Sequence, residues 1–179
     1  MTGSGSSQET FSHLHIWGRS MAIDGRELRN AMGLFATGVT VITTKDASGE
    51  PFGLTANAFS SLSLDPPMLL ICVDKGVDCY ACFDESKVFG VNFLSLAQEE
   101  LSTRFATKGI EKFEGLSYAV GELGVALLDG ALAHFECRVV HAYEGGDHTI
   151  YVGEVRRLVT MEGNPLLFFQ GKYRSLAPP

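Results

Sequence analysis

Several features are scarce or missing in this chain, and each absence removes a class of protein. No run of about 20 apolar residues occurs, and the first residues show no basic stretch followed by an apolar one. We therefore expect no membrane span and no secretion signal, and a cytoplasmic location. Lys and Arg number 14 against 21 Asp and Glu, giving a formal net charge of −7. Such an acidic chain is not expected to bind nucleic acid or an anionic membrane surface.

Familiar catalytic and metal motifs are also missing. No G-x-G-x-x-G opens a helix after a strand, so a Rossmann domain is not indicated, and neither GxSxG nor a P-loop occurs. Cys79 and Cys82 form a single CxxC without a second pair, which favours structural thiols over a zinc or redox site. His134, Cys137 and His141 lie on an expected strand. Alternation places Cys137 and His141 on one face and His134 on the other unless a bulge intervenes, so we expect no metal site.

The composition that remains is that of one globular domain. Hydrophobic residues make up 45% and charged residues 20% of 179 residues, enough for one sizeable core. The start of the chain is rich in Gly and Ser, as in MTGSGSS. We expect a flexible N-terminal segment over residues 1–23 and a single folded domain over residues 24–179.

Residues 53–75 are the most informative stretch. Their first half is built from small side chains, GLTANAFSS, and their second half contains the apolar run MLLICV. Asp65-Pro66-Pro67 lies between the halves, which predicts two strands joined by a rigid connection, the second strand buried on both faces. A strand of small residues packs poorly by itself. It either lies close against a helix or strand, or it lets a flat ligand approach the backbone and bind hydroxyl and amide groups.

The remaining patterns predict a chain that is mainly β with a few helices. Asp24 and Glu27 form a capping box for a helix that Gly38 ends, and Ser95 and Gln98 form a second one. A third, short helix is expected over residues 77–85. The expected strands are residues 39–44, 52–60 (a hairpin with the first), 68–73, 88–92, 131–143, 149–160, 166–169 and 173–176. Many short strands with turn signals favour an antiparallel sheet closed into a barrel.

GLTANAFSSLSLDPP resembles the signature of the flavin reductase-like family, the short-chain NAD(P)H:flavin oxidoreductases of two-component monooxygenases. The similarity extends through FATGVTVIT upstream and through Asn92, Glu136-Cys137 and Gly146-Asp147-His148 downstream, and covers residues 24–176. Ala58 and Gly130 depart from the family pattern without affecting a core feature. The resemblance implies an antiparallel Greek-key split barrel of the FMN-binding type, and usually a homodimer with flavin near the subunit interface.

The resemblance also implies a site. His148 follows Gly145-Gly146-Asp147 at an expected hairpin turn, where the residues alone favour a solvated histidine. In the family this position lies beside the flavin ring and the nicotinamide, so His148 is expected to position substrate or deliver a proton. Cofactor contacts are expected from small or polar side chains near the strand ends and the second helix: Thr37, Thr55, Ala56, Asn57, Ser60, Ser61, Cys72, Val73, Asp74, Asn92, Ser102, Arg104, Phe105 and Tyr173. Within this set Ser60, Ser61, Ser102 and Arg104 are candidates for the phosphate.

The expected activity is hydride transfer from NADH or NADPH to FMN or FAD, with the reduced flavin supplied to a partner monooxygenase. A site made of backbone groups, hydroxyls and one amide suits this task, because the cofactors carry the chemistry and the protein holds two rings together. Two alternatives remain open. One is a flavin-dependent reductase of another acceptor, such as a corrinoid or a ferric complex, and the other is a non-catalytic module that binds flavin or haem.

Overall fold

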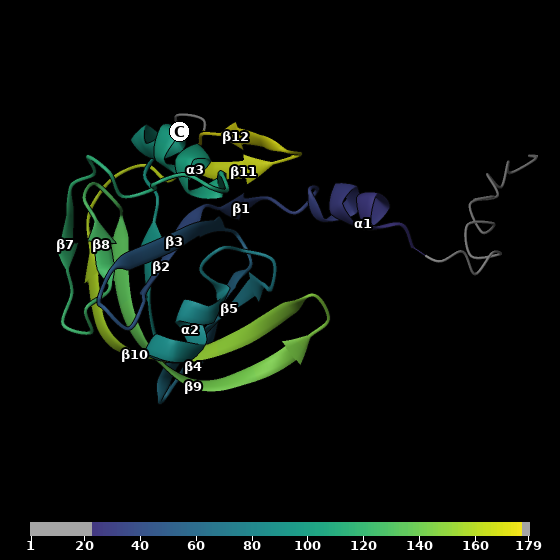
Figure 1. The fold of residues 1–179 in the computed structure, drawn as a ribbon. Coiled ribbons are helices and arrows are strands. Elements are labelled where there is room, and N and C mark those ends of the chain that lie inside the picture. Colours follow the sequence, from purple (N-terminus) through teal and green to yellow (C-terminus); the bar gives the residue numbers. More distant parts are fainter. Residues whose placement is uncertain (1–22, 177–179) are drawn as a thin grey trace, which may run out of the picture.

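One curved antiparallel sheet dominates the protein. The structure, a computed structural model, describes residues 23–176, so all but Ile23 of the predicted flexible segment lies outside it (Figure 1). The main sheet has seven strands, which in spatial order are β3 (Pro51–Ala56), β2 (Thr40–Lys45), β6 (Val88–Phe93), β9 (Ala133–Gly145), β10 (His148–Thr160), β5 (Pro67–Asp74) and β4 (Phe59–Leu64). The prediction of a mainly β chain with antiparallel pairing is confirmed.

The two edges of this sheet come close together. β3 and β4 lie at opposite ends of the strand order, yet only Asn57 and Ala58 separate them in the chain. The step from Ala56 to Phe59 spans at most about 11 Å, even when fully extended. The sheet must therefore roll until its edges nearly meet, and it remains open between them, because no pairing of β3 with β4 is found among the described residues. This is the split barrel that the family resemblance implied.

The crossover between the edges corrects one sequence prediction. Residues 52–60 were expected to form one strand, but the chain leaves the sheet after Ala56 and re-enters it at Phe59 on the far edge. The physical reason is closure of the barrel, which no local pattern records. We call residues Asn57 and Ala58 the crossover.

The burial of β5 corrects a second prediction. Leu69, Ile71 and Val73 are buried, whereas the residues between them, such as Leu70 and Cys72, are only partly covered. The strand therefore alternates, with one face in the core, rather than being buried on both faces.

Two helices pack on the barrel. α2 (Tyr80–Ser86) places Phe83 against Tyr151, with ring centroids 5.5 Å apart. η1 (Leu96–Gln98) leads into α3 (Glu99–Ala106), and the predicted capping box of Ser95 and Gln98 is confirmed. α3 lies against β3 because residue 53 is glycine: a Cβ there would stand 2.8 Å from the ring of Phe105. At Gly53, the small-residue strand is therefore small because α3 packs closely against it.

Two small sheets complete the fold, and the sequence predicted them only in part. β7 (Tyr118–Val120) and β8 (Ala126–Leu128) form a hairpin beside β6 that was not predicted. β1 (Thr37–Gly38), β11 (Leu167–Phe169) and β12 (Lys172–Arg174) form a three-stranded sheet, in which Thr37 pairs with Phe168. The sequence predicted that Gly38 ends the first helix. This was wrong, because the helix ends at Met32 and Gly38 belongs to β1.

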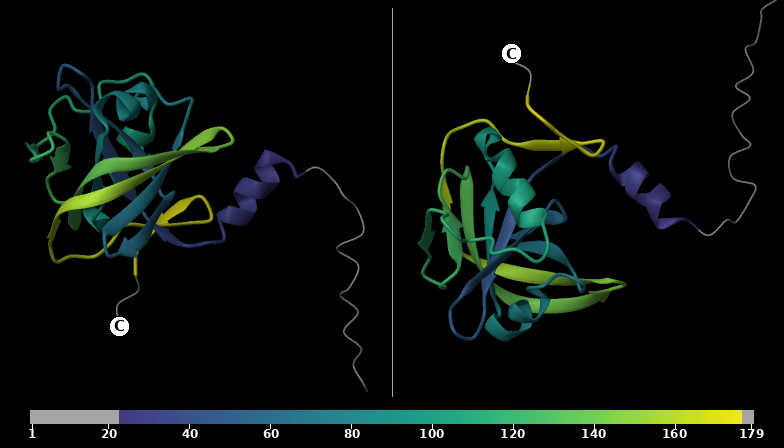
Figure 2. Two further views of the ribbon diagram at one scale, coloured as in Figure 1. Left: turned by 90° about the horizontal axis from the view of Figure 1, so that it is seen from below. Right: turned by 45° about the horizontal axis from the view of Figure 1, so that its top comes forward.

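The first helix, α1 (Gly25–Met32), projects from the barrel. The Asp24 side chain caps it by accepting a hydrogen bond of 3.0 Å from the Arg26 N–H, which confirms the predicted N-cap. The return bond from the Glu27 side chain, which the predicted capping box also requires, is not found among the described residues. None of its residues is buried, and Leu28, Met32 and nearby Phe35 are 53%, 59% and 70% exposed. The helix projects on the same side as the β9–β10 and β11–β12 hairpins (Figures 1 and 2).

Candidate active site

The crossover brings the predicted site residue Asn57 together with others from two strands, β1 and β5. The Asn57 side-chain amide donates to the Thr37 hydroxyl at 3.3 Å, and the Ala58 carbonyl accepts a hydrogen bond of 3.0 Å from the Cys72 N–H. Asn57 and Ala58 are exposed, and Thr37 and Cys72 are half-buried. A small, accessible backbone segment is thus flanked by a hydroxyl, an amide and a thiol. Burial raises the pKa of the Cys72 thiol, so this group is neutral at physiological pH.

The tip of the β9–β10 hairpin forms a second group of residues. His148 opens β10 and lies opposite Asp74, the last residue of β5, in the antiparallel register. The imidazole Nδ1 lies 2.7 Å from the Asp147 carboxylate, and the His148 side chain is 39% exposed. The hydrogen bond from His148 lowers the pKa of Asp147. The strand pairing therefore places the predicted catalytic histidine beside Cys72, Val73 and Asp74, at the same end of β5 as the crossover.

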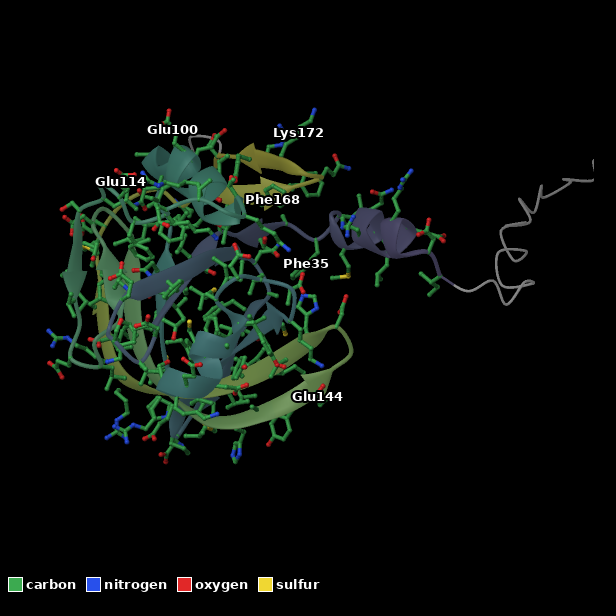
Figure 3. All side chains as sticks on the ribbon, viewed as in Figure 1. Phe35, Glu100, Glu114, Glu144, Phe168 and Lys172 are labelled. Atoms are coloured by element: carbon green, nitrogen blue, oxygen red, sulfur yellow. The ribbon has the colours of Figure 1, made fainter. Side chains whose placement is uncertain are left out.

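A chain of hydrogen bonds connects three further predicted residues. The Thr55 hydroxyl donates to the Ser102 carbonyl at 2.6 Å, and the hydroxyls of Ser102 and Tyr173 are 2.8 Å apart. The Tyr173 ring packs edge-on against Phe168, the strand partner of Thr37. β3, α3 and the β11–β12 hairpin are thereby tied together beside the crossover. Figure 3 shows Phe168 and Phe35 on the side of the barrel from which α1 projects, with Glu144 of the hairpin below them.

Asn92 is placed in the core and is fully engaged by its own chain. Its amide donates to the Val41 carbonyl at 3.1 Å, and its oxygen accepts from the Leu128 N–H at 2.8 Å. The same oxygen lies 2.9 Å from His134 Nδ1, so that nitrogen carries a proton. Burial lowers the pKa of His134, which favours the neutral ring. These contacts join β2, β6, β8 and β9, and a cofactor role for Asn92 is still only a prediction.

The candidate phosphate residues fall in two elements, β4 and α3. The Arg104 guanidinium donates to the carbonyls of Glu111 and Glu114, and thereby holds the loop that follows α3. Ser60 and Ser61 are exposed on the edge strand β4. Phe105 is fully buried and packs against the ring of Phe113. Ala56, the last residue of β3, is partly buried and packs against the hydrophobic core. The predicted roles of these residues remain predictions.

The cysteine and histidine patterns take structural positions. Cys79 and Cys82 are buried free thiols, and burial raises the pKa of Cys79 to about 11. In β9, a bulge at Val140 interrupts the alternation, so buried Cys137 and exposed His141 do not share a face. That part of the sequence prediction was wrong. Over residues 23–176, neither a His/Cys/Asp/Glu cluster suited to a metal nor a helix suited to crossing a membrane is found.

One residue at this site was missed by the sequence analysis. Lys75 follows β5 directly, its N–H donates to the Asp147 carbonyl at 3.0 Å, and its Nζ donates to the Gly146 carbonyl at 3.0 Å. The Nζ also pairs with the Glu144 carboxylate, which raises the pKa of Lys75. A lysine at the end of a strand next to an acidic hairpin is the signal that was available, but the pairing of β5 with β10 joins segments 74 residues apart in the chain.

A rolled antiparallel sheet that remains open between its two edges, with exposed hydrogen-bonding groups at the crossover, defines the split-barrel class of fold. Within that class, this chain belongs to the flavin reductase-like family, because its residues 32–177 match the flavin reductase like domain.

The chain is similar to several named members of this family. It is 43% identical over 150 residues to the FMN reductase (NADH) SmoA of Agrobacterium fabrum, covering 84% of this chain and 85% of that one. It is 39% identical over 158 residues to the reductase subunit HsaB of a flavin-dependent monooxygenase from Rhodococcus jostii, covering 88% and 80%. The solved NADH:FAD oxidoreductase SgcE6 of Streptomyces globisporus, in complex with NAD and FAD fragments, superimposes with a TM-score of 0.81 at 38% identity, covering 89% and 98%.

These similarities confirm the family, the fold and the class of activity predicted from the sequence. The relatives are named as NADH-dependent reductases of FMN or FAD and as reductase subunits of flavin-dependent monooxygenases. An oxidoreductase that uses flavin and reduced nicotinamide is therefore the class to which this enzyme belongs.

Proposed function

We propose that this protein reduces FMN or FAD with NADH and supplies the reduced flavin to a separate monooxygenase. The observation that carries the proposal is the placement of Asp147 and His148 next to the end of β5, two residues from the Cys72 N–H that binds the crossover. The crossover, with its hydrogen-bonding backbone groups, and the imidazole of His148 thus lie at the same end of β5.

The residues present suit a flavin ring. The crossover side chains are small and exposed, so a flat ring can approach the peptide groups of Asn57 and Ala58. The edge of a flavin's pyrimidine ring carries both donors and acceptors, and the Thr37 hydroxyl, the Asn57 amide and the peptide groups supply both as well. A Cβ added at Gly38 would meet nothing within 4 Å, which leaves room beside Thr37. Thr37, Asn57, Ala58 and Cys72 are therefore the residues that would hold the ring.

Each group has a limited task in the reaction. Bound flavin supplies the hydride-accepting ring, and the protein supplies the alignment of that ring with the nicotinamide. The Asp147 carboxylate accepts a hydrogen bond from His148 Nδ1–H, which fixes the imidazole and leaves Nε2 free to contact substrate or pass a proton. The Thr55–Ser102–Tyr173 hydrogen bonds hold the neighbouring elements in place. Tyr173 is half-buried, so part of its side chain remains accessible to a bound flavin or nicotinamide.

We further propose a cytoplasmic homodimer. Four free cysteines suit a reducing compartment. The support for a second copy is α1, because an isolated helix of this length is marginal in water and this one buries none of its residues. Docking on another subunit would cover the exposed Leu28, Met32 and Phe35. The monooxygenase partner is proposed because relatives of this chain are reductase subunits of flavin-dependent monooxygenases.

The test is an anaerobic assay with purified protein, FMN or FAD, and NADH or NADPH. We expect bleaching of the visible flavin band at a rate proportional to enzyme, with NADH preferred. His148→Ala should slow bleaching more than it weakens flavin binding, and His141→Ala, on the exposed part of the same hairpin, serves as the matched control. Tight flavin binding without bleaching by either nicotinamide would instead support a binding module. Turnover only with an added corrinoid or ferric complex would support the other reductase class.

A further inference from the structure

The tip of the β9–β10 hairpin has support on one side only. β6 pairs with β9 up to Arg138, and the last backbone bond on that side runs from the Val139 N–H to the Lys87 carbonyl at 2.9 Å. Beyond this point residues 140–147 are all exposed. A two-stranded ribbon is marginally stable in water by itself, so the position of the tip depends on β5 and on the turn that begins at Lys75.

Lys75 supplies that support through three separate contacts. Its backbone N–H binds the Asp147 carbonyl, and its side-chain ammonium binds the Gly146 carbonyl and the Glu144 carboxylate. The contacted residues are Glu144, near the end of β9, and Gly146 and Asp147 in the turn directly before His148. One residue therefore connects the end of β9 and the turn that precedes β10 to the end of β5.

The base from which Lys75 extends is itself fixed. The Asp74 carboxylate accepts from the Gly76 N–H at 2.7 Å, and Lys108 donates to the Gly76 carbonyl at 2.9 Å. The Asp78 carboxylate accepts from the Gly109 N–H at 3.2 Å. The turn after β5 is thus tied to the loop after α3, and that loop is held in turn by Arg104. Lys75 reaches the tip from a braced position.

We propose that Lys75 is a positioning residue for the reductase reaction. It fixes the hairpin tip and so holds the Asp147–His148 pair beside the end of β5, near the crossover, where His148 would contact the nicotinamide. This rests on the proposed function of His148. Exposed ion pairs contribute little to global stability, and Glu144 is mostly exposed. Loss of the Lys75 contacts therefore frees the tip while the barrel remains folded, and its effect is on turnover rather than on folding.

The experiment compares Lys75→Met with wild type in the full chain, using anaerobic NADH turnover and flavin binding by fluorescence. We expect kcat to fall about five- to tenfold, the size that loss of one exposed pair and one hydrogen bond allows. Flavin affinity and the thermal midpoint should be unchanged. Lys75→Arg, which can still reach Glu144, should recover most of the turnover. Lys87→Met is the matched control, because Lys87 makes a comparable exposed pair with Asp84 at 3.1 Å.

A double mutant separates this proposal from the one on which it rests. If Lys75 acts through His148, adding Lys75→Met to His148→Ala should cause no further loss of kcat. Additive losses, or wild-type kcat in Lys75→Met, would overturn the positioning role while leaving that of His148 intact. If His148→Ala keeps the wild-type kcat while Lys75→Met lowers it, the role of His148 is refuted, and with it any action of Lys75 through that residue.

Discussion

Replacing Asn92 by alanine should destabilise the barrel, whereas replacing Asn57 by alanine should weaken flavin binding. The two asparagines of the predicted site, Asn57 and Asn92, are chemically identical but differ in burial. Asn92 is fully buried, and its loss would leave the Leu128 N–H and the Val41 carbonyl without their side-chain partner. Each buried backbone group left unpaired costs about 1–3 kcal/mol, so the free energy of unfolding should fall by roughly 2–5 kcal/mol.

The assay is thermal and urea unfolding of both variants, followed by flavin binding measured on the folded fraction. For a chain of this size, a loss of about 2–5 kcal/mol lowers the midpoint by roughly 5–15 °C. Asn57→Ala removes one exposed hydrogen bond of 3.3 Å, so its midpoint should stay within about 2 °C of wild type while flavin binding weakens. A stable Asn92→Ala protein with weakened flavin binding would refute this reasoning and make Asn92 a cofactor contact.

Three other predictions test packing, pH dependence and assembly. Gly53→Val should lower the free energy of unfolding by about 1–3 kcal/mol in urea titrations, because its Cβ would meet the Phe105 ring at 2.8 Å, and unchanged stability would contradict that contact. Burial raises the pKa of Cys79 from 9.0 to about 11, so between these pH values the folded state keeps a proton that the unfolded state loses. The free energy of unfolding should therefore fall as pH rises from 9 to 11, and this fall should be smaller in Cys79→Ala. Leu28→Glu with Met32→Glu should shift the light-scattering mass from dimer to monomer, and an unchanged mass would exclude α1 from the interface.

Local patterns predicted those parts of the fold that local forces determine. The N-cap at Asp24, the capping box of Ser95 and Gln98 and the turn before His148 were predicted correctly, because each depends on neighbours in the chain. The crossover at Asn57 and Ala58 could not be found in this way, since no Gly or Pro marks it and closure of the whole sheet places it. β7 and β8 are three residues each, too short to show a period.

The candidate site was predicted by residue type but not by environment. Thr55, Ser102 and Tyr173 are polar residues of the kind that bind a cofactor, and the structure shows them bonded to one another. Lys75 carried no motif, and only the pairing of β5 with β10 gives it a partner. Which polar groups remain free for a ligand is decided by contacts between distant segments, and a single sequence does not contain that information.

The strand order also bears on how the chain acquires its shape. β9 and β10 meet across a turn at Gly146 and Asp147, so this central hairpin costs little loop-closure entropy to form. β6 joins it from 40 or more residues away, and β5 from 74 or more. Such distant pairings form slowly compared with a hairpin. The hairpins β2–β3 and β4–β5 are as local as β9–β10. The slow steps are therefore the pairings between these hairpins, and the crossover reaches its final position only when those pairings have formed.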